Sequence, residues 1–182
     1  MGLDIAGFSH LRYVCRLPKQ GEDEQFEADL KAQGLDPDEV VNLYPNAASH
    51  AAQMGETEPG CYAKTERSEE HEFRAGSYSG YNQWREWLAQ FAHGVPASVL
   101  WKSWSKFQGK PFVELIDFTD CDGRIGATVA AKLAADFKTH ADRAKEFAAT
   151  LGEGEGEYFL EVYADFTTAL ELAARNGALI FN

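Results

Sequence analysis

The sequence has little of what would place it in a membrane or on nucleic acid. No apolar run approaches the roughly 20 residues of a membrane span, and no charged-then-apolar leader opens the chain. Lysine and arginine number 17 against 29 aspartates and glutamates, a formal net charge of -12. Because contacts to a phosphate backbone need clustered basic residues, we expect neither direct binding to nucleic acid nor a membrane partner.

Cysteine and histidine are also scarce, and their spacing predicts no metal or redox motif. The three cysteines, Cys15, Cys61 and Cys121, are far apart and form no CxxC pair. We interpret them as reduced, small buried residues of a cytoplasmic protein. The five histidines show neither HxxxH nor HExxH spacing, and GxSxG is absent. We therefore predict no cofactor, metal or catalytic residue, although catalysis by Ser, His and Asp stays open.

What is present is a core-forming composition with a mixed pattern of periodicities. Hydrophobic residues make up 45% of the 182 residues and aromatic residues 13%, enough for one well-formed core in a single domain, residues 1–182. Alternating and helical spacings predict an α+β fold, in which a mixed or antiparallel sheet is packed by about three to five helices. Strands are expected at 3–5, 11–15, 61–65, 71–78, 112–118 and 178–181, and helices at 23–33, 36–44, 81–93, 98–107, 126–151 and 158–175.

The negative charge is concentrated in one part of the chain. Residues 20–70 hold 13 acids and three bases, and the stretch 46–60 within them has no strong period and is predicted to be a loop. One interpretation is an acidic patch that meets a basic partner or mimics nucleic acid. The other is a solvated, partly irregular segment that keeps the protein soluble.

The first candidate site is the serine-rich stretch where a predicted strand leads into a predicted helix, residues 74–85. Backbone N–H groups at a helix start, with hydroxyls beside them, are suited to an anion, and tyrosine rings are suited to a planar group. The same residue types also serve a helix cap and a tight turn, and no Gly-Lys-Ser/Thr follows the glycines. The candidate ligand-binding residues here are Arg74, Ser77, Tyr78, Ser79, Tyr81 and Arg85.

The second candidate site lies between the predicted strand 112–118 and the predicted helix 126–151. Asp117, Asp120 and Asp122 could bind Mg²⁺ or act as general bases, and could equally cap the helix. We include Asp120 and Asp122 with the ligand-binding residues, and His10 as a residue that projects toward either loop. The four tryptophans fall in two WxxW pairs at helical spacing and are predicted to lie in the core.

Three blocks of this sequence resemble a family of uncharacterised proteins of tailed bacteriophages and prophages. They are the opening Met1-Gly-Leu-Asp-Ile5, the block from Arg74 to Tyr81 with Trp84-Arg85, and the block from Asp117 to Gly126. The resemblance that these blocks carry extends over about half of the chain. The resemblance implies a small soluble protein in the cytoplasm of an infected bacterium, of a kind that often acts against host defence. It implies no catalytic residue.

These observations rank three functions. The first is a non-catalytic binding protein for a small polar, nucleotide-like ligand, which would sequester a host defence signal. The second is an acidic inhibitor that presents residues 20–70 to a basic host defence protein. The third is a metal-dependent hydrolase that uses Asp117, Asp120 or Asp122. The oligomeric state and the identity of the ligand do not follow from the sequence.

Overall fold

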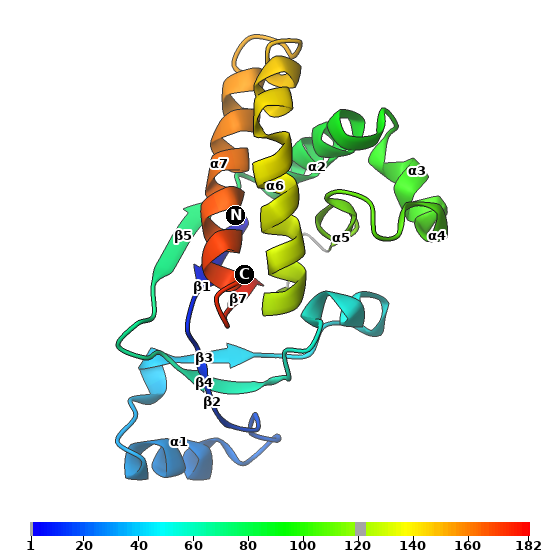
Figure 1. The fold of residues 1–182 in the computed structure, drawn as a ribbon. Helices are drawn as coiled ribbons and strands as arrows, with labels where there is room; N and C mark the ends of the chain where they lie inside the picture. The colour runs from blue at the N-terminus through cyan, green and yellow to red at the C-terminus, as the bar shows by residue number, and fades with distance from the viewer. Residues whose placement is uncertain (1, 119–122) are drawn as a thin grey trace.

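The computed structural model describes residues 2–118 and 123–182, and its elements form an α+β protein (Figure 1). Two antiparallel sheets lie between a pair of long helices and a short N-terminal helix. In chain order the elements are β1 (Asp4–Phe8), β2 (Arg12–Cys15), α1 (Asp23–Ala32), η1 (Pro37–Glu39), β3 (Val40–Leu43), η2 (Ala48–Met54), β4 (Gly60–Ala63), β5 (Glu70–Arg74), α2 (Tyr78–His93), α3 (Ala97–Lys102), α4 (Trp104–Phe107), α5 (Val113–Ile116), β6 (Gly123–Gly126), α6 (Ala127–Ala148), α7 (Glu155–Ala173) and β7 (Ala178–Phe181).

The first sheet has the strand order β5-β1-β7-β6, with every pairing antiparallel. The central strands β1 and β7 are largely buried on both faces because their alternating side chains enter two different cores, whereas the edge strand β5 is partly exposed. In β7, Leu179 and Phe181 belong to the larger core beneath the helices, whereas Ala178 and Ile180 belong to the smaller core shared with the second sheet. This sheet therefore forms the centre of the molecule.

The long helices α6 and α7 form an antiparallel hairpin that covers one face of the first sheet. Their apolar residues recur at helical spacing, as the sequence predicts, and Phe137, Phe159 and Phe166 are completely buried. Helix α7 lies very close to β1, because a Cβ added to Gly7 would be 2.5 Å from the carbonyl oxygen of Ala169. Only glycine permits this approach.

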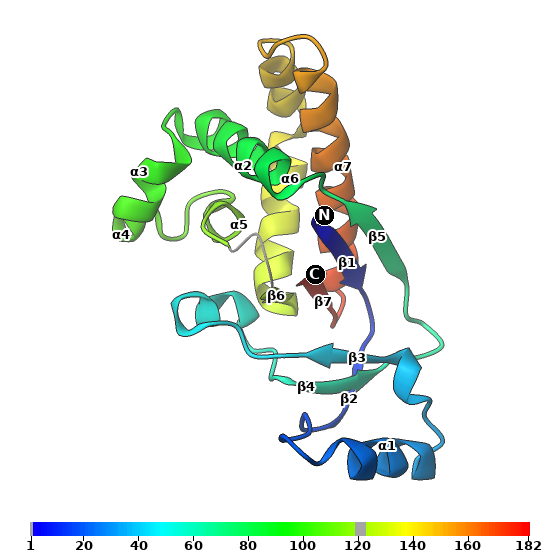
Figure 2. The same cartoon turned by 180° about the vertical axis from the view of Figure 1, so that it is seen from behind.

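The second sheet, of order β2-β4-β3, covers the opposite face of the first sheet (Figure 2). The chain enters it directly from β1 through Ser9, His10 and Leu11, and leaves it from β4 toward β5. Val41, Leu43 and Tyr62 pack from this sheet against the small core. Most of the acidic segment 20–70 therefore belongs to the ordered elements α1, η1, β3, η2 and β4.

The structure corrects several local predictions. The segment 112–118 is a short helix, α5, because Phe112 has a left-handed φ of 62° and turns the chain out of an extended path. A short apolar run fits a strand and a buried helix equally well, which is why the pattern misled. Within 36–44 the chain forms a 3₁₀ turn and the strand β3, and 46–60 contains η2.

Two further predictions need correction. The predicted helix 98–107 is interrupted at Ser103, which has φ -134°, and is divided into α3 and α4. The strands predicted at 61–65 and 71–78 both exist, as β4 and β5, but they belong to different sheets. The strand β6 was not predicted, because its four residues include two glycines.

Candidate functional site

Four of the predicted ligand-binding residues lie together at the start of α2. Ser77 is the N-cap of this helix, and its Oγ accepts a hydrogen bond of 3.1 Å from the backbone N–H of Gly80 and lies 3.0 Å from the Oγ of Ser79. Arg74 is exposed at the end of β5 and lies 3.5 Å from Asp4. Tyr78 is half-buried against the larger core. Ser77 therefore performs the capping role that the sequence left as an alternative.

Tyr81 and Arg85 lie further along α2 and belong to a different environment. Tyr81 is fully buried and its ring stacks on Trp84 at a centroid distance of 6.1 Å. Arg85 is 6% exposed and donates hydrogen bonds to the carbonyl oxygen of Phe118 and to the side chain of Asn82. The structure thus separates these two residues from the serines at the helix start.

His10 lies away from all of these residues. It follows β1 at the end where Phe8 pairs with Glu70, whereas Arg74 pairs with Asp4 at the other end of the same two strands. His10 has a left-handed φ of 51° and lines a separate surface hollow of about 620 Å³. Asp120 and Asp122 lie outside the described residues. The predicted residues therefore do not form one site in the part of the chain that is described.

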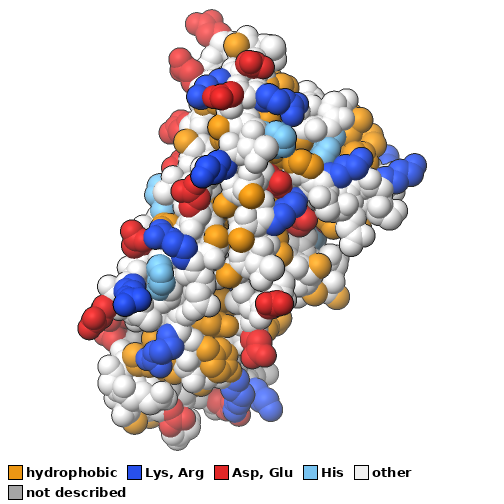
Figure 3. Space-filling model, in the orientation of Figure 1, with side chains coloured by type: hydrophobic (Ala, Val, Ile, Leu, Met, Phe, Trp, Pro, Cys, Tyr) orange, Lys and Arg blue, Asp and Glu red, His pale blue; other side chains and the backbone are white. Residues whose placement is uncertain are grey.

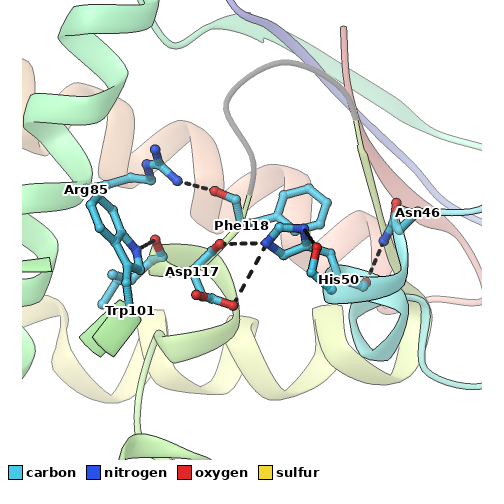
Figure 4. A network of polar contacts seen from close by, with 8 residues as sticks. Asn46, His50, Arg85, Trp101, Asp117 and Phe118 are labelled. Carbon is cyan, nitrogen blue, oxygen red and sulfur yellow. Dashed lines mark hydrogen bonds and ion pairs between the residues drawn. The ribbon is translucent and has the colours of Figure 1, made fainter. Parts of the chain in front are cut away.

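The structure instead brings together residues from four elements around Asp117, at the end of α5 (Figure 4). The Nε2 atom of His50 lies 3.0 Å from the backbone carbonyl oxygen of Asp117 and 3.9 Å from its carboxylate. Since a carbonyl oxygen only accepts, Nε2 carries the proton. Burial raises the pKa of the Asp117 carboxyl above its usual range, and the nearby charges of His50 and Arg85 oppose this rise only in part.

A second part of this network attaches η2 to the start of β6. The side-chain amide of Asn46 donates to the carbonyl oxygen of Arg124 at 2.7 Å, and its oxygen accepts from the N–H of Arg124 at 2.7 Å. The same amide donates to the carbonyl oxygen of His50 at 3.0 Å. Asn46 therefore holds the backbone of His50 in place, while the imidazole itself bonds to Asp117.

On the other side of Asp117, an exposed tryptophan lies over a buried arginine. Trp101 in α3 is 47% exposed, and its Nε1–H donates to the carbonyl oxygen of Ile116 at 3.2 Å. The guanidinium carbon of Arg85 lies 5.7 Å from the Trp101 ring centroid and 5.1 Å from that of Tyr81. The indole is thus fixed by a hydrogen bond and a cation–π contact, while part of its surface stays open to solvent.

The charge of the surrounding surface differs from that of the rest of the chain. No acidic residue occurs between Glu86 and Glu114, a stretch that contains α3 and α4 and carries Lys102, Lys106 and Lys110, all exposed. In Figure 3 the projection at the right, where Figure 1 places α3 and α4, shows lysine or arginine and hydrophobic side chains at its tip, with acidic atoms elsewhere. The exposed Trp101 therefore lies on the locally basic part of an acidic protein.

The tryptophan prediction is half right. Trp84 and Trp87 are buried, as the spacing predicts, whereas Trp101 is exposed and Trp104 is half-buried. The sequence feature that sets Trp101 and Trp104 apart is the stretch without acidic residues around them. The net charge of the whole chain does not reveal this stretch. His50 carried no signal, because its partner Asp117 is 67 positions away in the sequence and is brought to it only by folding.

The geometry distinguishes between a catalytic cluster and a structural clamp. The Oγ of Ser49 lies 3.1 Å from Nδ1 of His50, so Ser49, His50 and Asp117 are neighbours. In a catalytic triad, however, the imidazole N–H is donated to a carboxylate, whereas here a backbone carbonyl accepts it. Among residues 2–118 and 123–182, no group of three or more His, Cys, Asp or Glu is placed to hold a metal ion.

The fold and this network define an α+β protein with two antiparallel sheets and an exposed aromatic platform beside a His–Asp clamp. Comparison with protein-family models, with curated proteins and with solved structures finds no match to the chain. Within the described part of the chain, no helix combines the length and the apolar character needed to cross a membrane.

Proposed function

We propose that this protein is a non-catalytic binding protein for a small nucleotide-like ligand, and that Trp101 stacks on the planar base. The observation that carries the proposal is the indole of Trp101, which is 47% exposed although its N–H and one neighbouring cation hold it in place. A fixed, exposed aromatic ring loses little conformational entropy when a base stacks on it.

The charge pattern supports an anionic ligand at the same surface. With histidine counted as neutral, the only formal charges between Glu86 and Glu114 are positive. They belong to Lys102, Lys106 and Lys110. A phosphate group is attracted to this surface and repelled by the acidic segment 20–70, so the protein itself steers the ligand toward Trp101. With three lysines the surface suits a small phosphorylated molecule better than a long nucleic acid.

The biological setting of the proposal comes from the sequence resemblance to tailed-phage and prophage proteins. In that setting the protein acts in the cytoplasm of an infected bacterium, where it sequesters a nucleotide signal of host defence. Sequestration requires affinity without turnover, which agrees with the clamp role of His50. The nine residues first predicted as ligand contacts stay predictions, and Arg85 enters this proposal as a support for Trp101.

The test is calorimetric titration of the protein with a panel of mononucleotides and cyclic dinucleotides. Trp101→Ala should weaken binding by about 10-fold or more, because stacking of a base on an aromatic ring contributes about 1–3 kcal/mol. Trp101→Phe should keep part of the affinity. Val99→Ala is the matched control, since Val99 is exposed on the same helix and has no aromatic ring on which a base could stack.

Two outcomes would contradict the proposal. If none of the nucleotides binds, the ligand class is wrong. If Trp101→Ala and Val99→Ala bind a nucleotide as tightly as the parent protein, the ligand lies elsewhere, and the cluster of Arg74, Ser77, Tyr78 and Ser79 is the next surface to test.

The second candidate function is the acidic inhibitor of a basic host protein. It is favoured by α1, on which Asp23, Glu24 and Glu27 are exposed and only Leu30 is buried. Such a complex should weaken steeply as salt rises and should be lost when Asp23, Glu24 and Glu27 are changed together to lysine. A complex that forms equally well at 50 mM and at about 500 mM salt contradicts this second function.

A further inference from the structure

Two cysteines that are 46 positions apart in the sequence face each other across the second sheet. Cys15 in β2 and Cys61 in β4 are register partners, directly after a shift in register that follows Tyr13. Residues that face each other on antiparallel strands have Cα atoms about 4.5–5.5 Å apart. That range lies within the separation of about 4.4–6.8 Å over which a disulfide bond closes.

The two thiols also interact with each other. Burial of Cys61, and to a smaller extent the electrostatic effect of the neighbouring Cys15, raise the pKa of the Cys61 thiol to about 11. Side chains of facing residues on antiparallel strands lie on the same side of the sheet, so the two thiols are neighbours, as a disulfide requires.

The two cysteines differ in their access to solvent. Cys61 is completely buried, whereas Cys15 is half-buried and lines a surface cavity of about 330 Å³ between β2 and α1. The cavity is bordered by Arg16, Phe26 and Gln33. A small reagent in this cavity therefore reaches Cys15 and not Cys61.

We propose that Cys15 and Cys61 form a thiol–disulfide redox site, which is oxidised by a low-molecular-weight disulfide such as oxidised glutathione. The deprotonated sulfur of Cys15 attacks one sulfur of the reagent, the reagent's S–S bond breaks, and the first thiol leaves after taking up a proton. The sulfur of Cys61 then loses its proton and attacks the Cys15 sulfur, which releases the second thiol. The two cysteines are oxidised to a disulfide, and one reagent disulfide is reduced to two thiols.

The new bond would change the part of the molecule in which acidic residues far outnumber basic ones, residues 20–70. It would join the strands on either side of α1, η1, β3 and η2, and so close a loop over residues 15–61. Such a closure restricts the unfolded chain and stabilises this segment. The redox state would then control how firmly the acidic segment is held.

The test uses the full chain with Cys121→Ser, because Cys121 lies outside the described residues and would add a third thiol. The reduced protein is incubated with oxidised glutathione without denaturant, and intact mass and peptide mapping follow the products. We expect the loss of two hydrogen atoms, no retained glutathione, and one peptide that joins Cys15 to Cys61. The oxidised form should also melt at a higher temperature than the reduced form.

Two variants test the order of the steps. With Cys61→Ser the reaction should stop at a stable glutathione adduct on Cys15, and with Cys15→Ser labelling of Cys61 should be about tenfold slower or more. The proposal is overturned if the parent keeps glutathione on Cys15 without forming the cross-link, or if neither cysteine reacts. If Cys121→Ser does not fold, peptide mapping of the unaltered chain distinguishes the three pairings, and a pairing with Cys121 also overturns the proposal.

Discussion

Nε2 of His50 donates a hydrogen bond of 3.0 Å to the backbone carbonyl oxygen of Asp117, although 67 residues separate them. This bond attaches η2, from the acidic segment, to the end of α5. The ring of His50 also packs edge-on against Phe118 at a centroid distance of 5.7 Å. The imidazole therefore joins two segments next to the Trp101 surface.

Loss of the His50 imidazole should destabilise the protein. His50→Ala leaves the partly buried carbonyl oxygen of Asp117 without this donor, and we expect a loss of about 1–3 kcal/mol in the free energy of unfolding, measured in urea. Ser49→Ala is the matched control. It removes only a contact at an exposed serine and should change the free energy of unfolding by less than about 0.5 kcal/mol. Equal effects of the two variants would show that His50 is not a clamp.

Asp117 should make the stability of the protein depend on pH. Because burial raises its pKa in the folded state, the folded protein holds this proton more tightly than the unfolded chain does. The stabilising contribution is therefore complete at acidic pH and is lost as pH rises through the folded-state pKa. Asp117→Asn should raise Tm at pH 7.5 relative to the parent, and the difference should shrink toward pH 4.

The size and the sign of this effect can both be checked by calorimetry. Each kcal/mol corresponds to about 2–4 °C in Tm for a chain of this size. Should Asp117→Asn instead lower Tm by the same amount at both pH values, the interaction of the carboxylate with His50 and Arg85 outweighs the cost of its burial.

Because α7 packs so closely on β1, any side chain at position 7 should destabilise the protein. In Gly7→Ala the new methyl group would meet the backbone of Ala169 at 2.5–2.7 Å, so helix and strand must separate. We expect a loss of about 1–3 kcal/mol in urea denaturation. In the control Gly152→Ala, the nearest atom is the flexible carboxylate of Glu155 at 2.9 Å, which can move away. A Gly7→Ala variant as stable as Gly152→Ala would contradict the close packing.

The parts of the fold that the sequence predicts well are those with long periodic patterns. The helices that contain Trp84, Phe137 and Phe166 follow from apolar residues repeated over several turns, and their positions in the structure agree within a few residues. The segment around Phe112 failed because five consecutive or nearly consecutive apolar residues carry no period. A single left-handed residue, which the sequence does not reveal, decides that this segment turns.

The candidate site was less predictable than the fold. Ser77 occurs where a cap is expected, and the structure places it there. By contrast, the exposure of Trp101 depends on where α3 ends and on the position of Arg85 beneath its ring. Helical spacing predicts that an aromatic residue is buried. It does not reveal that the helix that carries Trp101 is only six residues long.

By itself the sequence determined the α+β class, the concentration of acidic residues in 20–70, and the helices that form the larger core. These features depend on residue type and on local spacing. Only the tertiary structure decided that Cys15 faces Cys61 and that His50 reaches Asp117. Both contacts join residues far apart in the chain, and they depend on strand register and on the closure of long loops, which no local pattern encodes.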